Sequence, residues 1–69
     1  MKKININTPY ITLGQFLKYV SLISSGAYAK EFLQETKVYV NNELETRRGR
    51  KLYEAYQIKV NDNEYIIGK

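Results

Sequence analysis

The sequence predicts an α+β fold in which two helices pack on a small antiparallel sheet with hairpins. Up to about residue 35, apolar residues recur at helical spacing, and after Thr36 the apolar spacing changes to two. With only 69 residues the chain makes one domain. A core of this size contributes no more than ~3–5 kcal/mol of net stability, so nearly every large apolar residue is needed in it.

The first helix is expected over residues 12–22, after an irregular or short extended lead-in over residues 1–11. Thr12 and Gln15 fit a capping box, in which each side chain bonds a backbone N–H that the helix start leaves unpaired. Leu13, Phe16, Leu17 and Val20 follow at helical spacing, which leaves Gly14, Gln15 and Lys18 on the outer face.

A second helix is expected over residues 26–35, after the break at Ser24-Ser25-Gly26. Ala29, Phe32 and Leu33 form its apolar arc, and Glu31 and Glu35 lie on the opposite side, one turn apart.

Short strands follow the helices. Val38 and Val40 alternate with polar residues, and Asn41-Asn42-Glu43 supplies a turn because asparagine tolerates left-handed backbone angles. A return strand begins near Leu44. Two further strands lie around residues 56–60 and 65–67, with a turn at 61–63. The core residues expected from these patterns are Leu13, Phe16, Leu17, Phe32, Val38, Val40 and Ile58.

Composition argues against an enzyme. The chain has no histidine to act as a base near neutral pH and no cysteine to act as a nucleophile or thiolate ligand. Glu43 and Glu45 share a strand face beside a turn, where a carboxylate pair is expected to be solvated. We therefore expect no catalytic residue, metal site, cofactor or small-molecule substrate. No apolar run approaches the ~20 residues that span a bilayer, so we expect a soluble, cytoplasmic protein without a membrane partner.

Positive charge is concentrated in one segment. The net charge is +4, and Arg47, Arg48, Arg50 and Lys51 place four positive charges within five residues around Gly49. This segment, called the basic loop here, lacks the periodicity of a helix or strand. Such a run favours an anionic partner, although a solvated loop that only aids solubility is the simpler reading of the charges alone.

A family resemblance decides between these readings. Residues 25–33 (SGAYAKEFL), followed by Val38-Tyr39-Val40-Asn41-Asn42, resemble the S4 (alpha-L) RNA-binding domain over about residues 12–60. Residues 11–18 (ITLGQFLK) and 47–52 (RRGRKL) further resemble the short, stand-alone, YaaA-like members. Gly26 stands where that family usually has an arginine, which shifts the weight of RNA binding onto the basic loop.

The resemblance implies one S4-like domain over residues 12–69 that binds structured RNA, ribosomal RNA above all, in ribosome assembly or translation. The expected RNA-binding residues are Arg47, Arg48, Arg50, Lys51, Lys18, Lys30, Gln15, Ser25 and Tyr53. Two alternatives remain: a protein-interaction module docking on an acidic or ribosomal partner, and DNA binding by the helix pair. The RNA hypothesis fails if the basic loop folds back onto the domain's own glutamates and the protein ignores ribosomal RNA at low ionic strength.

Overall fold

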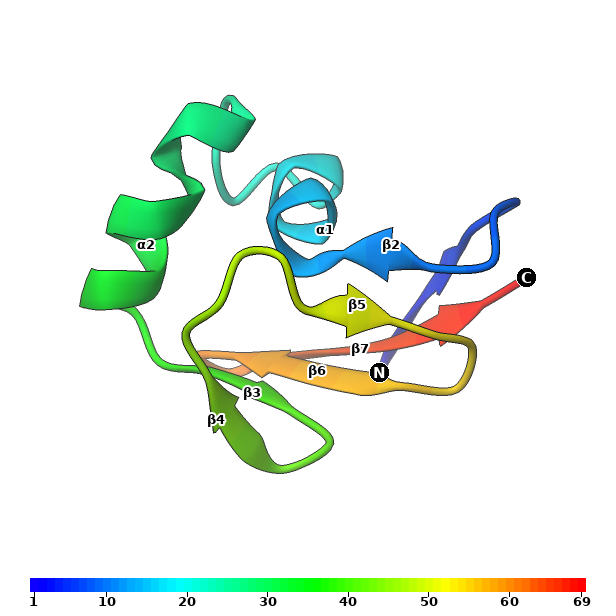
Figure 1. Ribbon diagram of the computed structural model, residues 1–69. Helices are drawn as coiled ribbons and strands as arrows, with labels where there is room; N and C mark the ends of the chain where they lie inside the picture. The colour runs from blue at the N-terminus through cyan, green and yellow to red at the C-terminus, as the bar shows by residue number, and fades with distance from the viewer.

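Two short helices lie over one face of a five-stranded sheet in the computed structural model, which describes residues 1–69 (Figure 1). The sheet has the strand order β1-β7-β6-β3-β4, and β2 pairs with β5 as a separate antiparallel ribbon. The strands are β1 (Lys2–Asn5), β2 (Ile11–Thr12), β3 (Val38–Val40), β4 (Glu43–Glu45), β5 (Lys51–Leu52), β6 (Gln57–Val60) and β7 (Asn63–Gly68). The helices are α1 (Leu13–Tyr19), the 3₁₀ turn η1 (Gly26–Tyr28) and α2 (Ala29–Glu35).

The α+β class is confirmed, but the sheet is mixed and not antiparallel. Strand β1 pairs in parallel with β7, in the register Lys2↔Tyr65 to Asn5↔Gly68. The extended stretch expected within residues 1–11 is therefore an edge strand of the main sheet. Strands β1 and β2 precede the helices, so the helices are not the first elements of the chain. The sequence did not reveal this pairing because only Ile4 and Ile6 alternate there, and both are only half-buried.

Helix α1 begins where the sequence predicted and ends early. The Thr12 hydroxyl accepts from the Gln15 N–H, and the Gln15 side-chain oxygen accepts from the Thr12 N–H, so the capping box is formed. The helix stops at Tyr19, three residues short of the expected end, and Ser21 takes a left-handed φ of 64°. Residues 26–28 of the second predicted helix form a 3₁₀ turn, and the α-helix proper starts at Ala29.

The asparagine turns form as predicted. Asn41 and Asn42 have φ of 52° and 70° and connect β3 to β4 in a two-residue hairpin. Asn61, with a φ of 55°, begins the turn from β6 into β7. Such angles are the mirror image of ordinary turn angles and match the twist of the paired strands.

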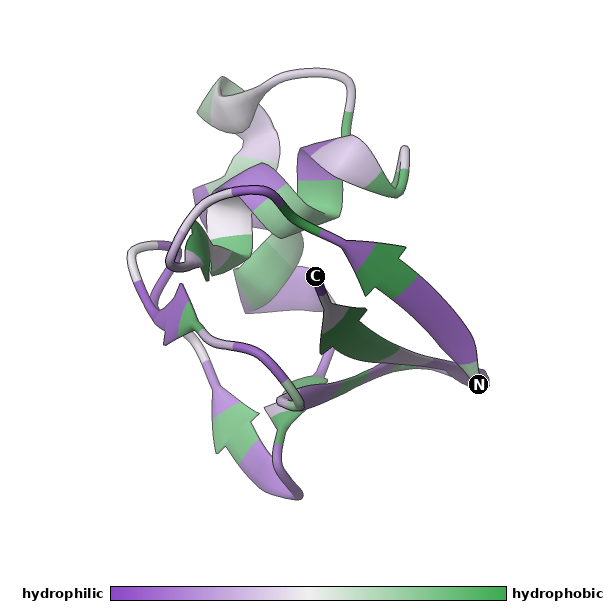
Figure 2. Cartoon of the chain, turned by 90° about the vertical axis from the view of Figure 1, so that its right-hand side faces the viewer, coloured by the Kyte–Doolittle hydropathy of each residue, from purple (hydrophilic) through white to green (hydrophobic).

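The core lies between the helices and the inner face of the sheet. Bands of hydrophobic and hydrophilic residues alternate along the helices (Figure 2), as expected for elements with one buried side. The fully buried side chains are Phe16, Leu13, Leu17, Leu52, Ile58, Ile67, Val38, Val40 and Val60. All the predicted core residues are buried except Phe32, which is half-buried and packs against the cluster.

Two positions reverse the expected pattern. Leu44, the apolar residue near which the return strand was expected to begin, is 55% exposed, whereas Glu45 beside it is only 6% exposed. Glu45 pairs with Val38, whose side chain is fully buried, so the pleat of β4 turns Glu45 toward the inside and Leu44 outward. Glu43 is solvated as expected, but Glu45 is not.

Neither α-helix could cross a membrane, because each has only seven residues, well short of the length a bilayer requires.

Candidate RNA interface

The basic loop follows β4 and rises against the start of α1 (Figure 1), and its last residue, Lys51, begins β5. Its backbone is fastened there by two hydrogen bonds: the Leu13 N–H donates to the Arg50 carbonyl at 2.8 Å, and the Gly14 N–H donates to the Arg48 carbonyl at 2.9 Å. With Thr12 accepting from the Gln15 N–H, the first three N–H groups of α1 are all paired within the chain. The loop is therefore held in one position on the scaffold.

Gly14 lies beneath the docked loop and is buried, not on the outer face of α1 as the sequence predicted. A Cβ at position 14 would meet the Arg48 carbonyl oxygen at 3.4 Å and the Ala29 Cβ at 3.5 Å, which are ordinary van der Waals contacts. The first turn of α1, the first turn of α2 and the basic loop thus converge at Gly14.

A β-branched side chain at position 14 is expected to push the loop off α1. Gly14→Val should lower the free energy of unfolding by ~1–3 kcal/mol, the usual cost of overpacking. Gly14→Ala is the matched control, since its Cβ fits and alanine favours a helix over glycine by up to ~1 kcal/mol. Thermal unfolding followed by circular dichroism compares the two. Equal stability of the two variants would contradict close docking of the loop.

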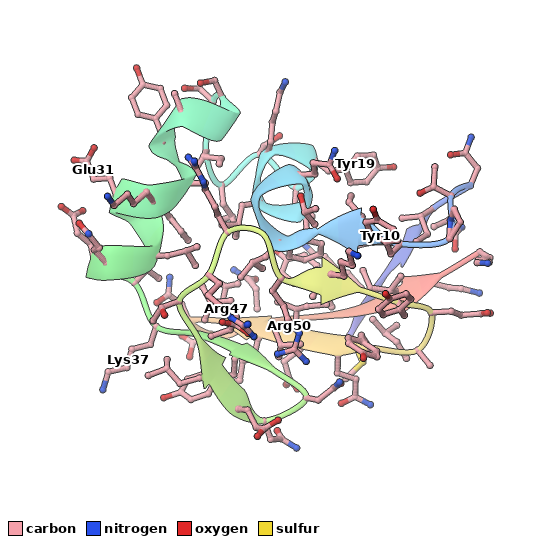
Figure 3. The ribbon with its side chains drawn as sticks, viewed as in Figure 1. Tyr10, Tyr19, Glu31, Lys37, Arg47 and Arg50 are labelled. Carbon is pink, nitrogen blue, oxygen red and sulfur yellow. The ribbon has the colours of Figure 1, made fainter.

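The buried carboxylate of Glu45 organises the inside of the loop. Its Oε2 accepts from the backbone N–H groups of Thr46 and Arg47 and from Arg47 Nε, each at 3.0 Å. Its Oε1 accepts from Arg47 Nη2 at 3.1 Å and from Arg50 Nη1 at 2.7 Å. The side-chain hydrogen bonds from Arg47 lead the effects that hold the pKa of Glu45 at about 2, against an ordinary value of 4.5. Figure 3 shows Arg47 and Arg50 side by side under the loop.

The four predicted cations therefore divide into two pairs. Arg47 and Arg50 are bonded to Glu45, although the Arg47 side chain stays 72% exposed and that of Arg50 only 25%. Arg48 and Lys51 are exposed and form no salt bridge within the chain. The sequence suggested four free cations in this segment. The structure leaves two of them free and ties two to an acid located just ahead of the run.

Aromatic rings extend the basic loop toward β2. Lys51 lies opposite Thr12 in the β2–β5 ribbon, and its Nζ sits 5.0 Å from the centre of the Tyr10 ring. Tyr53, an expected RNA contact, is 41% exposed and packs between Tyr10 and Tyr56, with ring centres 5.8 and 5.7 Å away. Tyr10 and Tyr56 are members of this surface that sequence reasoning missed. The alternation of Tyr10, Ile11 and Thr12 could have indicated a short strand, but it does not show that this strand pairs with β5.

The remaining predicted residues lie around this surface. Gln15 and Lys18 are exposed on α1 and line a groove with Tyr10 and Tyr19. Lys30 is exposed on α2, directly after Ala29. Ser25 is half-buried, and its hydroxyl accepts from the Ala27 N–H to cap η1, so the structure gives it a local structural role.

The two acidic residues of α2 lie away from the basic loop. Glu31 points outward from α2, away from Arg47 and Arg50 (Figure 3), and Glu35 is exposed one turn later on the same helix. Since a carboxylate repels phosphate, the outward placing of Glu31 and Glu35 and the pairing of Glu45 with two arginines favour a polyanion on the loop side.

Two comparisons with known proteins show the family of this chain. A family model described as an S4 domain matches residues 4–68, which takes in the end of β1, the helices and the basic loop. A protein of Bacillus subtilis (strain 168) named "Probable ribosome maturation protein RlbA" is 60% identical over 50 residues, covering 72% of this chain and 70% of that protein. On these two findings, the chain belongs to the S4 domain family.

Proposed function

We propose that this protein is a non-enzymatic RNA-binding protein that binds structured RNA, above all ribosomal RNA, and acts in ribosome maturation. Membership of the S4 domain family and the name of the Bacillus relative support this class of function. We further infer that α1, α2 and the strands form the alpha-L motif over residues 12–69, and that the protein works in the cytoplasm with ribosomes or their assembly intermediates.

The observation that carries the proposal is the fixed position of the basic loop. Because the Arg48 and Arg50 carbonyls are bonded to α1, the chain holds its cations on a rigid surface before RNA arrives. A preorganised surface loses less conformational entropy on binding than a flexible loop would. Arginine suits the task, since a planar guanidinium can grip phosphate through two parallel hydrogen bonds.

In this proposal the residues contribute unequally. Arg48 and Lys51 supply full positive charges to phosphate, with Lys18 and Lys30 at the edges. Arg47 is exposed enough to offer its remaining N–H groups to a phosphate while it stays bonded to Glu45. Arg50, mostly covered, holds the loop in shape. Ser25 contributes to RNA binding only through the position of α2.

The salt dependence of binding tests the proposal. The loop carries four cations, and the single carboxylate of Glu45 offsets one of them, so a net charge of about three remains to displace counterions from RNA. The logarithm of the affinity is therefore expected to fall against the logarithm of the salt concentration with a slope of roughly −2. Filter retention of ribosomal RNA by the purified chain across a salt series measures this slope. A duplex DNA competitor of equal length is the control and is expected to compete weakly. Absence of retention at low ionic strength, or equal competition by DNA, would reject the proposal.

A further inference from the structure

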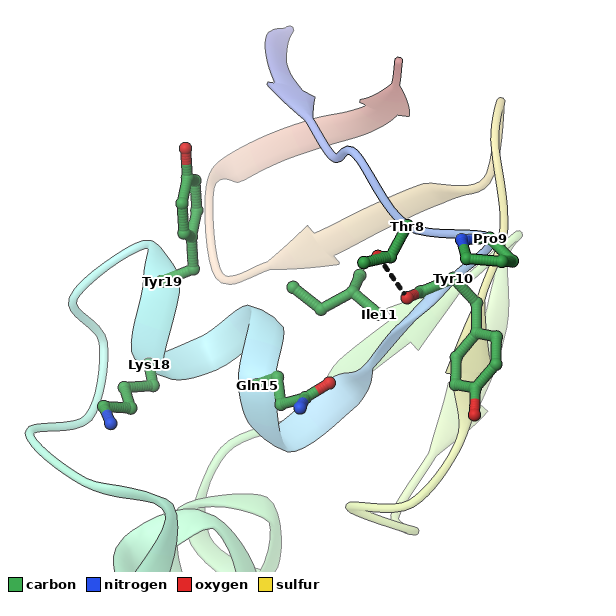
Figure 4. A pocket seen from close by; sticks show the side chains of 7 residues that line it. All are labelled: Thr8, Pro9, Tyr10, Ile11, Gln15, Lys18 and Tyr19. Carbon is green, nitrogen blue, oxygen red and sulfur yellow. Dashed lines mark hydrogen bonds between the residues drawn. The ribbon is translucent and has the colours of Figure 1, made fainter.

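A surface groove lies on the β2 side of the basic loop, where Lys51 approaches Tyr10 at one end of the groove. It has an open volume of about 690 Å³ and runs between the segment leading into β2 and the exposed side of α1. Tyr10 and Tyr19 stand at its two ends, with Ile11 and Gln15 between them and Lys18 on the α1 side (Figure 4). Neither phosphate binding by the basic loop nor the fold requires two exposed tyrosines here.

The two rings are available to a ligand. Tyr19 is 63% exposed and Tyr10 is 37% exposed. Tyr10 is also held in place, because Tyr53 packs against its ring and the Lys51 ammonium lies 5.0 Å from its centre. A nucleotide that approaches Tyr10 would therefore meet an ordered ring with a positive charge over it, and that charge could move to the neighbouring phosphate and free the ring face for a base.

Gln15 supplies a directed hydrogen-bond donor in the same groove. Its side-chain oxygen is committed to the Thr12 N–H at 3.0 Å, so the orientation of its amide is fixed by the capping box. The amide NH₂ makes no hydrogen bond within the chain, and Gln15 lines the groove. Every nucleobase carries carbonyl or ring-nitrogen acceptors on its edge, and these edges are free only in unpaired RNA.

We propose that this groove binds an unpaired RNA base, which stacks on a tyrosine and accepts a hydrogen bond from the Gln15 amide while Lys18 and Lys51 meet the adjacent phosphates. The proposal rests on the RNA-binding function above and deepens it. The basic loop binds the RNA backbone, and the groove binds a neighbouring nucleotide only if its base is unpaired. Stacking on one aromatic residue contributes ~1–3 kcal/mol per base, which corresponds to at least about fivefold in affinity.

The test compares two RNA oligonucleotides of equal length and charge, one with natural bases and one with an abasic backbone. Intact protein is titrated with each, and binding is followed by tyrosine fluorescence and by calorimetry. We expect the oligonucleotide with bases to bind at least about fivefold more tightly. Tyr10→Leu and Tyr19→Ala are each expected to lower this ratio, and Gln15→Glu, which keeps the capping box but removes the donor, should lower it as well.

Tyr28→Ala is the matched control. Tyr28 is 53% exposed but lines a separate groove beside Glu31 and Glu35, so the ratio should not change. Circular dichroism confirms that each variant is folded. A ratio near one for the wild-type chain, or the same loss in Tyr28→Ala as in Tyr10→Leu, would overturn the proposal. So would binding of adenosine monophosphate as tight as that of the oligonucleotide, since the site would then serve free nucleotides.

The two proposals fail in distinguishable ways. If ribosomal RNA is retained with the expected salt dependence while the two oligonucleotides bind equally, only the groove assignment fails. If the wild-type chain binds no RNA at low ionic strength, both fail.

Discussion

Glu45→Gln is expected to lower the free energy of unfolding by about 3 kcal/mol, a large share of the stability of so small a domain. The estimate follows from the fall of the Glu45 pKa from 4.5 to about 2 in a carboxylate that is only 6% exposed. The substituted amide would also place an NH₂ group against the N–H donors of Arg47. Thermal unfolding should show a fall in Tm of more than ~10 °C.

The effect has a defined pH window. Because folding lowers the pKa of Glu45, its ionised form stabilises the native state fully above pH 4.5, and this contribution is lost as the pH falls toward 2. The stability difference between wild type and Glu45→Gln should therefore shrink over that range. Glu43→Gln, on the same strand but exposed, is the control and should change stability by less than ~0.5 kcal/mol. A difference independent of pH, or equal effects of the two variants, would contradict the assigned role.

The double variant Arg48→Glu with Lys51→Glu is expected to weaken binding of ribosomal RNA about 100-fold. Both side chains are exposed and have no salt-bridge partner within the chain, so the reversal removes two of the proposed phosphate contacts and leaves Glu45 paired. Hydrogen bonds to charged groups contribute ~1.5–3 kcal/mol each, and two lost contacts account for the expected factor. Filter retention or gel shift at fixed salt measures it.

Lys37→Glu with Lys59→Glu is the matched control, because it gives the same net charge while changing exposed lysines outside the loop. RNA binding by this control should stay close to that of wild type. An equal loss in both double variants would mean that net charge, and not the basic loop, governs binding. Arg50→Glu is a poor probe of RNA binding, since it would place a second carboxylate beside Glu45, 2.7 Å from the present Arg50 Nη1.

The pairing with Glu45 bears on the condition set for the RNA hypothesis. The hypothesis was to fail if the basic loop folded onto the domain's own glutamates and the protein ignored ribosomal RNA. The first part of this condition is partly met, because Arg47 and Arg50 are bonded to Glu45. Arg48 and Lys51 do not, and the backbone of the loop is turned toward α1. The second part, whether the protein ignores ribosomal RNA, is the measurement that decides the function.

The sequence by itself determined the local elements. The capping box at Thr12 and Gln15, the asparagine turns and the buried alternation of Val38 and Val40 depend on interactions within a few residues, so they can be recognised from spacing. The S4 resemblance likewise rested on motifs that are contiguous in the chain, and the family match confirmed it.

Only the tertiary structure decided how distant segments meet. The parallel pairing of β1 with β7, the placing of Tyr10 beside Lys51, and the docking of the basic loop on Gly14 join residues that are tens of positions apart. The inward turn of Glu45 is also decided there, because an acid at a strand edge looks solvated until the loop that covers it is in place. Long-range pairing depends on the packing of the whole chain, whereas caps and turns depend on neighbouring residues. For this reason the sequence predicted the cationic residues of the basic loop, but it could not predict which of them are free and which are paired with Glu45.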